Sequence, residues 1–193
     1  ILDIAYSYHA TTNPNHIALD LISQSEHSND TFCYLITNSE KLAKNVDKII
    51  TELTDKIKRS DIVKTSLKVN GFIAICKNNS EMIKLANELA PEHLQIMTKN
   101  PNAFASKITS AGLVLLGPNT PSSASDYLLG SNHILPTNKF GKTRGSLSVL
   151  DFIKINTEVS TSKSVLSKIS KHMEIFTEAE GLPNHYEAVR GRI

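Results

Sequence analysis

The sequence has few cysteines and glycines and no long hydrophobic run, and each shortage excludes a class of protein. Two cysteines in 193 residues are too few for a disulfide framework. The eight glycines never form the Gly-x-Gly-x-x-Gly pattern that places a pyrophosphate at a helix N-terminus. No apolar stretch approaches the roughly 20 residues of a membrane helix, and the first residues lack the features of a signal peptide. We therefore expect a cytoplasmic protein without a membrane segment.

The charge balance excludes a strong electrostatic partner. The 21 basic and 19 acidic residues leave a formal net charge of +2, too small a field to recruit nucleic acid or an anionic membrane. The composition, 40% hydrophobic and 21% charged, is that of a globular protein. The chain opens on Ile1, without Met, and enters a strand-type run at once. We expect a further N-terminal portion to precede it.

Apolar strand-type runs alternate with helix-period segments along most of the chain. This alternation predicts an α/β fold with a mostly parallel sheet flanked by helices. The predicted strands cover residues 1–8, 32–37, 71–77, 94–98 and 111–116, and the predicted helices cover 80–89 and begin at Asn13-Pro14 and at Ser39. A further helix, 162–179, follows after the alternation has ended. The sequence thus predicts an α/β domain over 1–145 and a C-terminal extension with a helical tail over 146–193.

Four polar residues recur along the first predicted helix. His16, Asp20, Gln24 and His27 are spaced by four, four and three residues, which places them on one face of a helix. Gln24 and His27 can therefore reach one point in space. A solvated polar face is the alternative interpretation, because two donors alone do not hold a first-row metal ion, which needs three or four protein ligands.

A Glu-His pair follows a proline at a predicted junction between helix and strand. Glu92 and His93 can divide proton transfer between them if their surroundings bring their pKa values toward neutrality. The alternative is a helix-terminal histidine that makes one hydrogen bond.

Two further pairs of polar residues lie in segments rich in turn-forming residues. Asp126 and His133 bring a carboxylate and an imidazole into one loop region, although aspartate is also a good helix cap. Glu180 and His185 lie near the C-terminus, where a solvated tail is the alternative.

Taken in order, these segments resemble the histidinol dehydrogenase family, the zinc- and NAD-dependent enzymes of the last steps of histidine biosynthesis. The resemblance rests on the segments Asp20–His27, Glu88–Leu94, Asp126-Tyr127, Gly130–Thr137 and Ser146–Phe152, and on Glu180 and His185. Together they span nearly the whole chain in the order and approximate spacing of the family. Five matches in register make chance an implausible explanation.

The resemblance implies a role for each of these residues. It assigns Gln24, His27, Asp126 and His185 as zinc ligands, and a set of two imidazoles and two oxygen donors suits Zn²⁺. It assigns Glu92 and His93 as the acid–base residues, and it places His133 and Glu180 in contact with the substrate, together with His93 and the four zinc ligands. It also implies an incomplete Rossmann-like domain and a homodimer in which the C-terminal tail is exchanged.

The family reaction converts L-histidinol through an aldehyde to L-histidine with two hydride transfers to NAD. The resemblance implies that His93 takes the alcohol proton and that Glu92 helps to activate the water that hydrates the aldehyde. The NAD contacts are expected from an N-terminal half that this chain does not contain, and the family's substrate-binding serine falls on Leu2. The alternative is a truncated homologue that dimerises and binds zinc or an imidazole ligand without catalysis.

Overall fold

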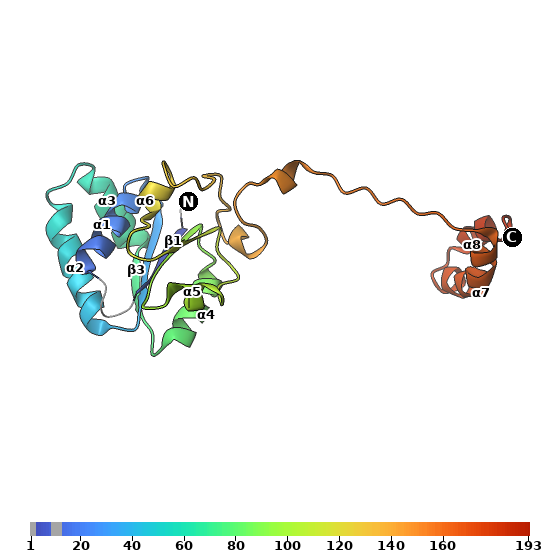
Figure 1. Ribbon diagram of the computed structural model, residues 1–193, viewed down its shortest axis with the longest axis horizontal. Helices are drawn as coiled ribbons and strands as arrows, with labels where there is room; N and C mark the ends of the chain where they lie inside the picture. Colours follow the sequence, from blue (N-terminus) through green and yellow to red (C-terminus); the bar gives the residue numbers. More distant parts are fainter. Residues whose placement is uncertain (1–2, 9–12) are drawn as a thin grey trace. The chain divides into compact units, whose positions relative to one another are not determined.

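The computed structural model describes residues 3–8 and 13–193, and it divides into two units, Ile1–Asp151 and Phe152–Ile193 (Figure 1). Leu2, the position of the expected substrate-binding serine, lies outside the described residues. No helix in the described part of the chain is long and apolar enough to cross a membrane.

A five-stranded sheet forms the centre of the first unit. Its strands are β1 (Asp3–Tyr8), β2 (Phe32–Thr37), β3 (Phe72–Ile75), β4 (His93–Met97) and β5 (Leu113–Leu116). The strand order is β3-β2-β1-β4-β5, and all four neighbouring pairs are parallel. The α/β class predicted from the sequence is confirmed. β1 is therefore the central strand, and β4 is an interior strand between β1 and β5.

Helices cover both faces of this sheet (Figure 1). One face carries α1 (Pro14–Ser25) and α2 (Glu40–Thr54), with α3 (Ser60–Asn70) beside them. The other face carries α4 (Asn79–Leu89) and the short α5 (Pro101–Ala105). A single turn, α6 (Ser122–Ser125), and the 3-10 turns Phe140–Lys142 and Val149–Phe152 follow β5.

Two apolar clusters hold the helices against the sheet. Cys33 and Leu35 of β2 pack with α1 and α2, whereas Tyr34 and Ile36 pack with α4 and α5. On β4, Leu94 and Ile96 join the second cluster. Because side chains alternate along a strand, the other residues of β4, among them His93 and Gln95, face the α1 side. The alternation thus places two buried polar side chains beneath α1.

The long helix predicted from Ser39 through Ile57 is interrupted. The chain leaves α2 after Thr54, and α3 starts at Ser60 after Arg59, whose φ of 57° is left-handed. The apolar residues keep helical spacing through Ile57, but the helical backbone of α2 ends at Thr54. Ser66 accounts for the second helix in part, because its buried hydroxyl donates a hydrogen bond to the carbonyl oxygen of Thr31 at 2.9 Å.

The second unit consists of an extended segment and two helices. Residues 153–162 have no regular structure, and α7 (Lys163–Ala179) then packs against α8 (Pro183–Arg190). Ser162 caps α7, since its hydroxyl accepts a hydrogen bond from the backbone N–H of Val165 at 3.3 Å. Large apolar side chains of α7 remain exposed, namely Val165, Ile169, Ile175 and Phe176.

Asp20 lies on the buried side of α1, and its burial makes the stability of the fold pH-dependent. Burial raises the pKa of its carboxyl from 3.8 to about 7, and the neighbouring amide of Gln95 opposes this shift only in part. Between about pH 4 and pH 7 the folded protein therefore holds a proton on Asp20 that the unfolded chain has lost. Stability is lost as the pH rises through this range.

We expect Asp20→Asn to flatten the pH dependence of stability between about pH 4 and pH 7. At pH 8 the variant should be the more stable protein, by about 4 kcal/mol at most, because each pKa unit corresponds to about 1.4 kcal/mol. Urea unfolding across this pH range measures the effect. The exposed Asp47 of α2 provides the control substitution, Asp47→Asn. A stability curve of the Asp20 variant parallel to that of the wild type would contradict the prediction.

Candidate functional site

The Pro-Glu-His segment lies at the amino end of β4, where α4 gives way to the strand. α4 ends at Leu89, and Ala90 adopts a left-handed conformation with φ 48° and ψ 58°. Non-glycine residues rarely adopt this conformation, which turns the chain sharply from the helix into the sheet. Glu92 and His93 follow this turn and are both buried, at 4% and 0% exposure. The predicted junction between helix and strand is confirmed, with β4 beginning at His93.

A close backbone approach fixes this junction from the other side. The backbone N–H of Gly112 donates to the carbonyl oxygen of Pro91 at 2.9 Å, and that of Leu113 donates to Glu92 at 2.8 Å. A Cβ atom at Gly112 would lie 2.7 Å from the carbonyl oxygen of Glu92 and 2.9 Å from Pro136 Cδ. Glycine is therefore required, and its lack of a side chain lets the loop containing Pro136 pack beside Glu92 and His93.

Asp126 connects two imidazoles. It caps the C-terminus of α6, and its Oδ1 lies 3.2 Å from His93 Nε2 and 3.2 Å from His133 Nδ1. The His93 ring is fully buried, whereas His133 is exposed. Burial lowers the pKa of His93, and the negative charge and hydrogen bond of Asp126 oppose this shift. His93 is therefore a neutral imidazole at pH 7, the form that can accept a proton.

The second ring nitrogen of His93 faces Glu92. His93 Nδ1 lies 4.0 Å from Glu92 Oε1, beyond hydrogen-bond distance. A proton on Nε2 can be donated to Asp126 Oδ1 at 3.2 Å, which favours the tautomer whose lone pair is on Nδ1. A positive charge formed on the ring would lie between two carboxylates, those of Glu92 and Asp126. The arrangement suits a base that becomes an imidazolium during a reaction.

Gln24 reaches this cluster from α1. Its side chain is 1% exposed, and its Nε2 donates a hydrogen bond to Ser122 Oγ of α6 at 2.8 Å. Its Oε1 is buried and has no hydrogen-bond partner among the described residues. The interpretation of a solvated polar face is wrong for Gln24 and for Asp20, because both are buried. Of the four spaced residues, His16 and His27 are the exposed ones.

His27 lies beyond the end of the helix on which the sequence placed it. α1 ends at Ser25, and the backbone N–H of His27 donates to the carbonyl oxygen of Gln24 at 3.3 Å in a turn. A positive charge on His27 lowers the pKa of His93, which indicates that the two rings are near each other. The turn, and not a shared helix face, therefore carries His27 toward the cluster.

The donors in this cluster fit a zinc ion in part. Among the described residues, no three His, Cys, Asp or Glu side chains lie together in a way that could hold a metal. Gln24 adds an amide oxygen to the acidic and imidazole donors. Its Oε1 is buried and has no partner among the described residues, as expected for a metal ligand without its metal. Gln24, His27 and Asp126 would supply three of the usual four zinc ligands.

Glu180 and His185 belong to the second unit. Glu180 caps the C-terminus of α7, where its backbone N–H donates to Phe176 at 3.0 Å. His185 is an exposed residue of α8. The segment that could have been a solvated, irregular tail is therefore helical, and both side chains lie on or beside ordered helices.

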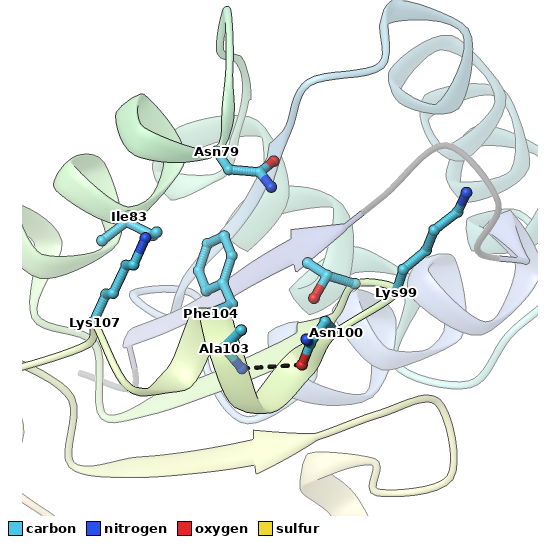
Figure 2. Close-up of a pocket in the computed structure, with 8 residues that line it drawn as sticks. Asn79, Ile83, Lys99, Asn100, Ala103, Phe104 and Lys107 are labelled. Atoms are coloured by element: carbon cyan, nitrogen blue, oxygen red, sulfur yellow. Dashed lines mark hydrogen bonds between the residues drawn. The ribbon is translucent and has the colours of Figure 1, made fainter.

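A cavity of about 240 Å³ lies at the opposite edge of the sheet (Figure 2). Thr98, Lys99 and Asn100, which directly follow β4, line it together with Asn79, Phe104 and Lys107. Open α/β sheets commonly bind ligands at this carboxyl edge. None of the residues predicted for the site lines the cavity, and Glu92, His93 and Asp126 lie instead at the amino end of β4.

The sequence did not single out Ser122 or Gln95, two buried polar residues of this region. Ser122 lies in a Pro-Ser-Ser-Ala-Ser segment that reads as an ordinary turn, and Gln95 lies in the middle of a strand. Only the alternation of β4, with Gln95 two residues after His93, carried a signal that both share one face.

Comparison with known proteins relates the whole chain to one family. The family model of histidinol dehydrogenase matches residues 4–193. Histidinol dehydrogenase from Methanocaldococcus jannaschii is 40% identical over 183 residues, which cover 95% of this chain and 42% of that protein. The enzyme from Methanopyrus kandleri is 39% identical over 183 residues, with 94% and 42% covered.

A crystal structure of histidinol dehydrogenase from Elizabethkingia anophelis superposes on this chain with a TM-score of 0.84 at 32% identity. The match covers 99% of this chain and 44% of that one. The chain thus spans less than half the length of the relatives it matches. Since sequence and fold agree along nearly all of its residues, this chain belongs to the histidinol dehydrogenase family.

Proposed function

We propose that this chain carries the acid–base residues and most of the zinc ligands of an enzyme that oxidises L-histidinol to L-histidine with NAD. The observation that carries the proposal is the buried, neutral His93 between the carboxylates of Glu92 and Asp126. A buried imidazole held in this way is costly for a protein that only needs to fold. Family membership supports the substrate class, and we infer that the first unit is an incomplete Rossmann-like domain.

His93 is the proton acceptor for the alcohol in this proposal. Its Nε2 faces the polar cluster, whereas Nδ1 faces Glu92 within the buried junction. The ring takes the hydroxyl proton at its unprotonated nitrogen, and the two flanking carboxylates stabilise the positive charge that results. Glu92 then assists the deprotonation of the water that adds to the aldehyde. The exposed His133, also in contact with Asp126, orients the substrate at the open side of the cluster.

Gln24, His27 and Asp126 of the first unit and His185 of the second would hold the zinc ion. When bound, zinc supplies positive charge that positions the substrate's nitrogen atoms and stabilises developing negative charge. Glu180 would contact the substrate beside His185. The residues of this chain do not fit an NAD site, since no glycine-rich fingerprint is present. We therefore assign the NAD contacts to the remaining length of the longer enzyme.

We further propose that the second unit exchanges between the two chains of a homodimer. The exposed apolar face of α7 would be covered in such a dimer, because large apolar patches on a helix usually mark an interface. His185 and Glu180 would then complete the site of the partner chain.

We expect His93→Gln to lower kcat for histidinol oxidation by about 10²–10⁴-fold in the complete enzyme, the usual contribution of a positioned base. Glutamine retains a donor for Asp126 but cannot accept the proton as imidazole does. NADH absorbance measures the rate, and His16→Gln, on the exposed side of α1, is the control. A variant with the wild-type kcat would exclude His93 as the base.

Removal of His27 should abolish tight zinc binding. We expect His27→Ala to lose most of the bound zinc, because a site with one imidazole fewer has too few ligands. Competition with a chelator measures the affinity in the complete protein. The matched variant is His16→Ala, which removes another exposed imidazole near the same helix. Equal zinc affinity in both variants would refute the assignment.

Subunit exchange tests the shared tail. His27→Ala and His185→Ala homodimers each have only damaged zinc sites. If the tail crosses to the partner, a mixed dimer contains one site with all four ligands and one that lacks two. We therefore expect tight zinc binding to reappear at about one ion per mixed dimer. Its absence, with exchange verified by mass spectrometry of intact dimers, would show that the tail serves its own chain.

A further inference from the structure

Ser122 is a buried polar residue of α6 whose side chain contacts α1. Its side chain is fully buried, and its Oγ accepts the hydrogen bond from Gln24 Nε2 at 2.8 Å. The two residues are 98 positions apart in the sequence. The contact therefore joins the helix that carries Gln24 to the turn that ends at Asp126.

This hydrogen bond involves the amide group of Gln24, whose oxygen and nitrogen atoms differ chemically. The oxygen of a carboxamide can bind a metal, whereas its NH₂ group is a donor and cannot. Both ends occupy nearly the same space, so packing alone does not choose between the two orientations of the Gln24 amide. Nε2 donates to Ser122, whereas Oε1 is buried and has no partner within residues 3–8 and 13–193. A buried carbonyl oxygen without a partner is costly unless another group satisfies it.

We propose that Ser122 is a positioning residue that accepts the hydrogen bond of Gln24 Nε2 when Oε1 binds the metal, so that the buried amide nitrogen keeps a partner. This inference rests on the proposed zinc site. Groups that orient metal ligands typically contribute a factor of 10 to 100 in metal affinity. Ser122 does so without touching the metal, by accepting the hydrogen bond from Nε2.

The test measures zinc affinity by chelator competition in the complete protein. We expect Ser122→Ala to weaken zinc binding about 10- to 100-fold. Ser122→Thr retains the hydroxyl and should restore most of the affinity. The control is Ser66→Ala, which removes another fully buried hydroxyl that donates to a backbone carbonyl far along the chain. Thermal unfolding of the metal-free variants reports any loss of stability separately.

A second background distinguishes the loss of this hydrogen bond from general damage to α6. In Gln24→Glu both terminal atoms are oxygens, so no amide nitrogen needs a partner. We expect Ser122→Ala to reduce zinc affinity in the Gln24 protein but to have little effect in the Gln24→Glu protein. An equal loss in both backgrounds would show that Ser122 only maintains the fold, and would overturn the inference.

The same measurements separate this inference from the proposed function. If His27→Ala abolishes zinc binding but Ser122→Ala binds as tightly as the wild type, the zinc site stands and the role of Ser122 is wrong. If His27→Ala binds zinc as tightly as the wild type, the proposed site itself is wrong, and the role of Ser122 falls with it.

Discussion

The pairing of β4 with β1 is the constraint on which the rest of this structure depends. Ile4 of the central strand β1 pairs with His93, so a segment from the middle of the chain enters the interior of the sheet beside the first strand. β4 is then flanked by β1 and β5 and covered by helices on both faces. Any side chain at its amino end is removed from water. The neutral state of His93 follows from this position, because burial penalises the charged imidazole more than Asp126 favours it.

The alternation of β4 divides its side chains between an apolar and a polar environment. Leu94 and Ile96 complete the core beneath α4 and α5, whereas His93 and Gln95 lie on the face toward α1, where Gln95 is a neighbour of Asp20. One strand thus supplies both packing energy and reactive groups, one residue apart. This arrangement lowers the stability of the fold, because the region between β4 and α1 contains buried polar atoms where apolar side chains would be more favourable. Buried polar groups that destabilise a fold commonly cluster at functional sites, which agrees with a functional role for these side chains.

The sequence predicted the features that depend on residues close to one another along the chain. Periodicity located α4 and the strand that follows it, and Pro91 marked the junction at which Glu92 and His93 lie. The break between α2 and α3 was missed because apolar spacing continues through Ile57 while the chain turns at Arg59. The burial of Asp20 and Gln24 was missed for another reason. Whether a polar face is solvated depends on which strand lies beneath it, and that is a contact between residues more than 70 positions apart in the sequence.

The short turn α6 has a consequence for how the site moves. Its four residues carry Asp126 at their end, yet they have too few backbone hydrogen bonds to hold together as an independent helix. The side-chain bond from Gln24 to Ser122 anchors this turn to the rigid sheet and helices. Asp126 Oδ1 lies 3.2 Å from both His93 and His133, so a change in this one turn would act on both imidazoles at once while the sheet stayed intact.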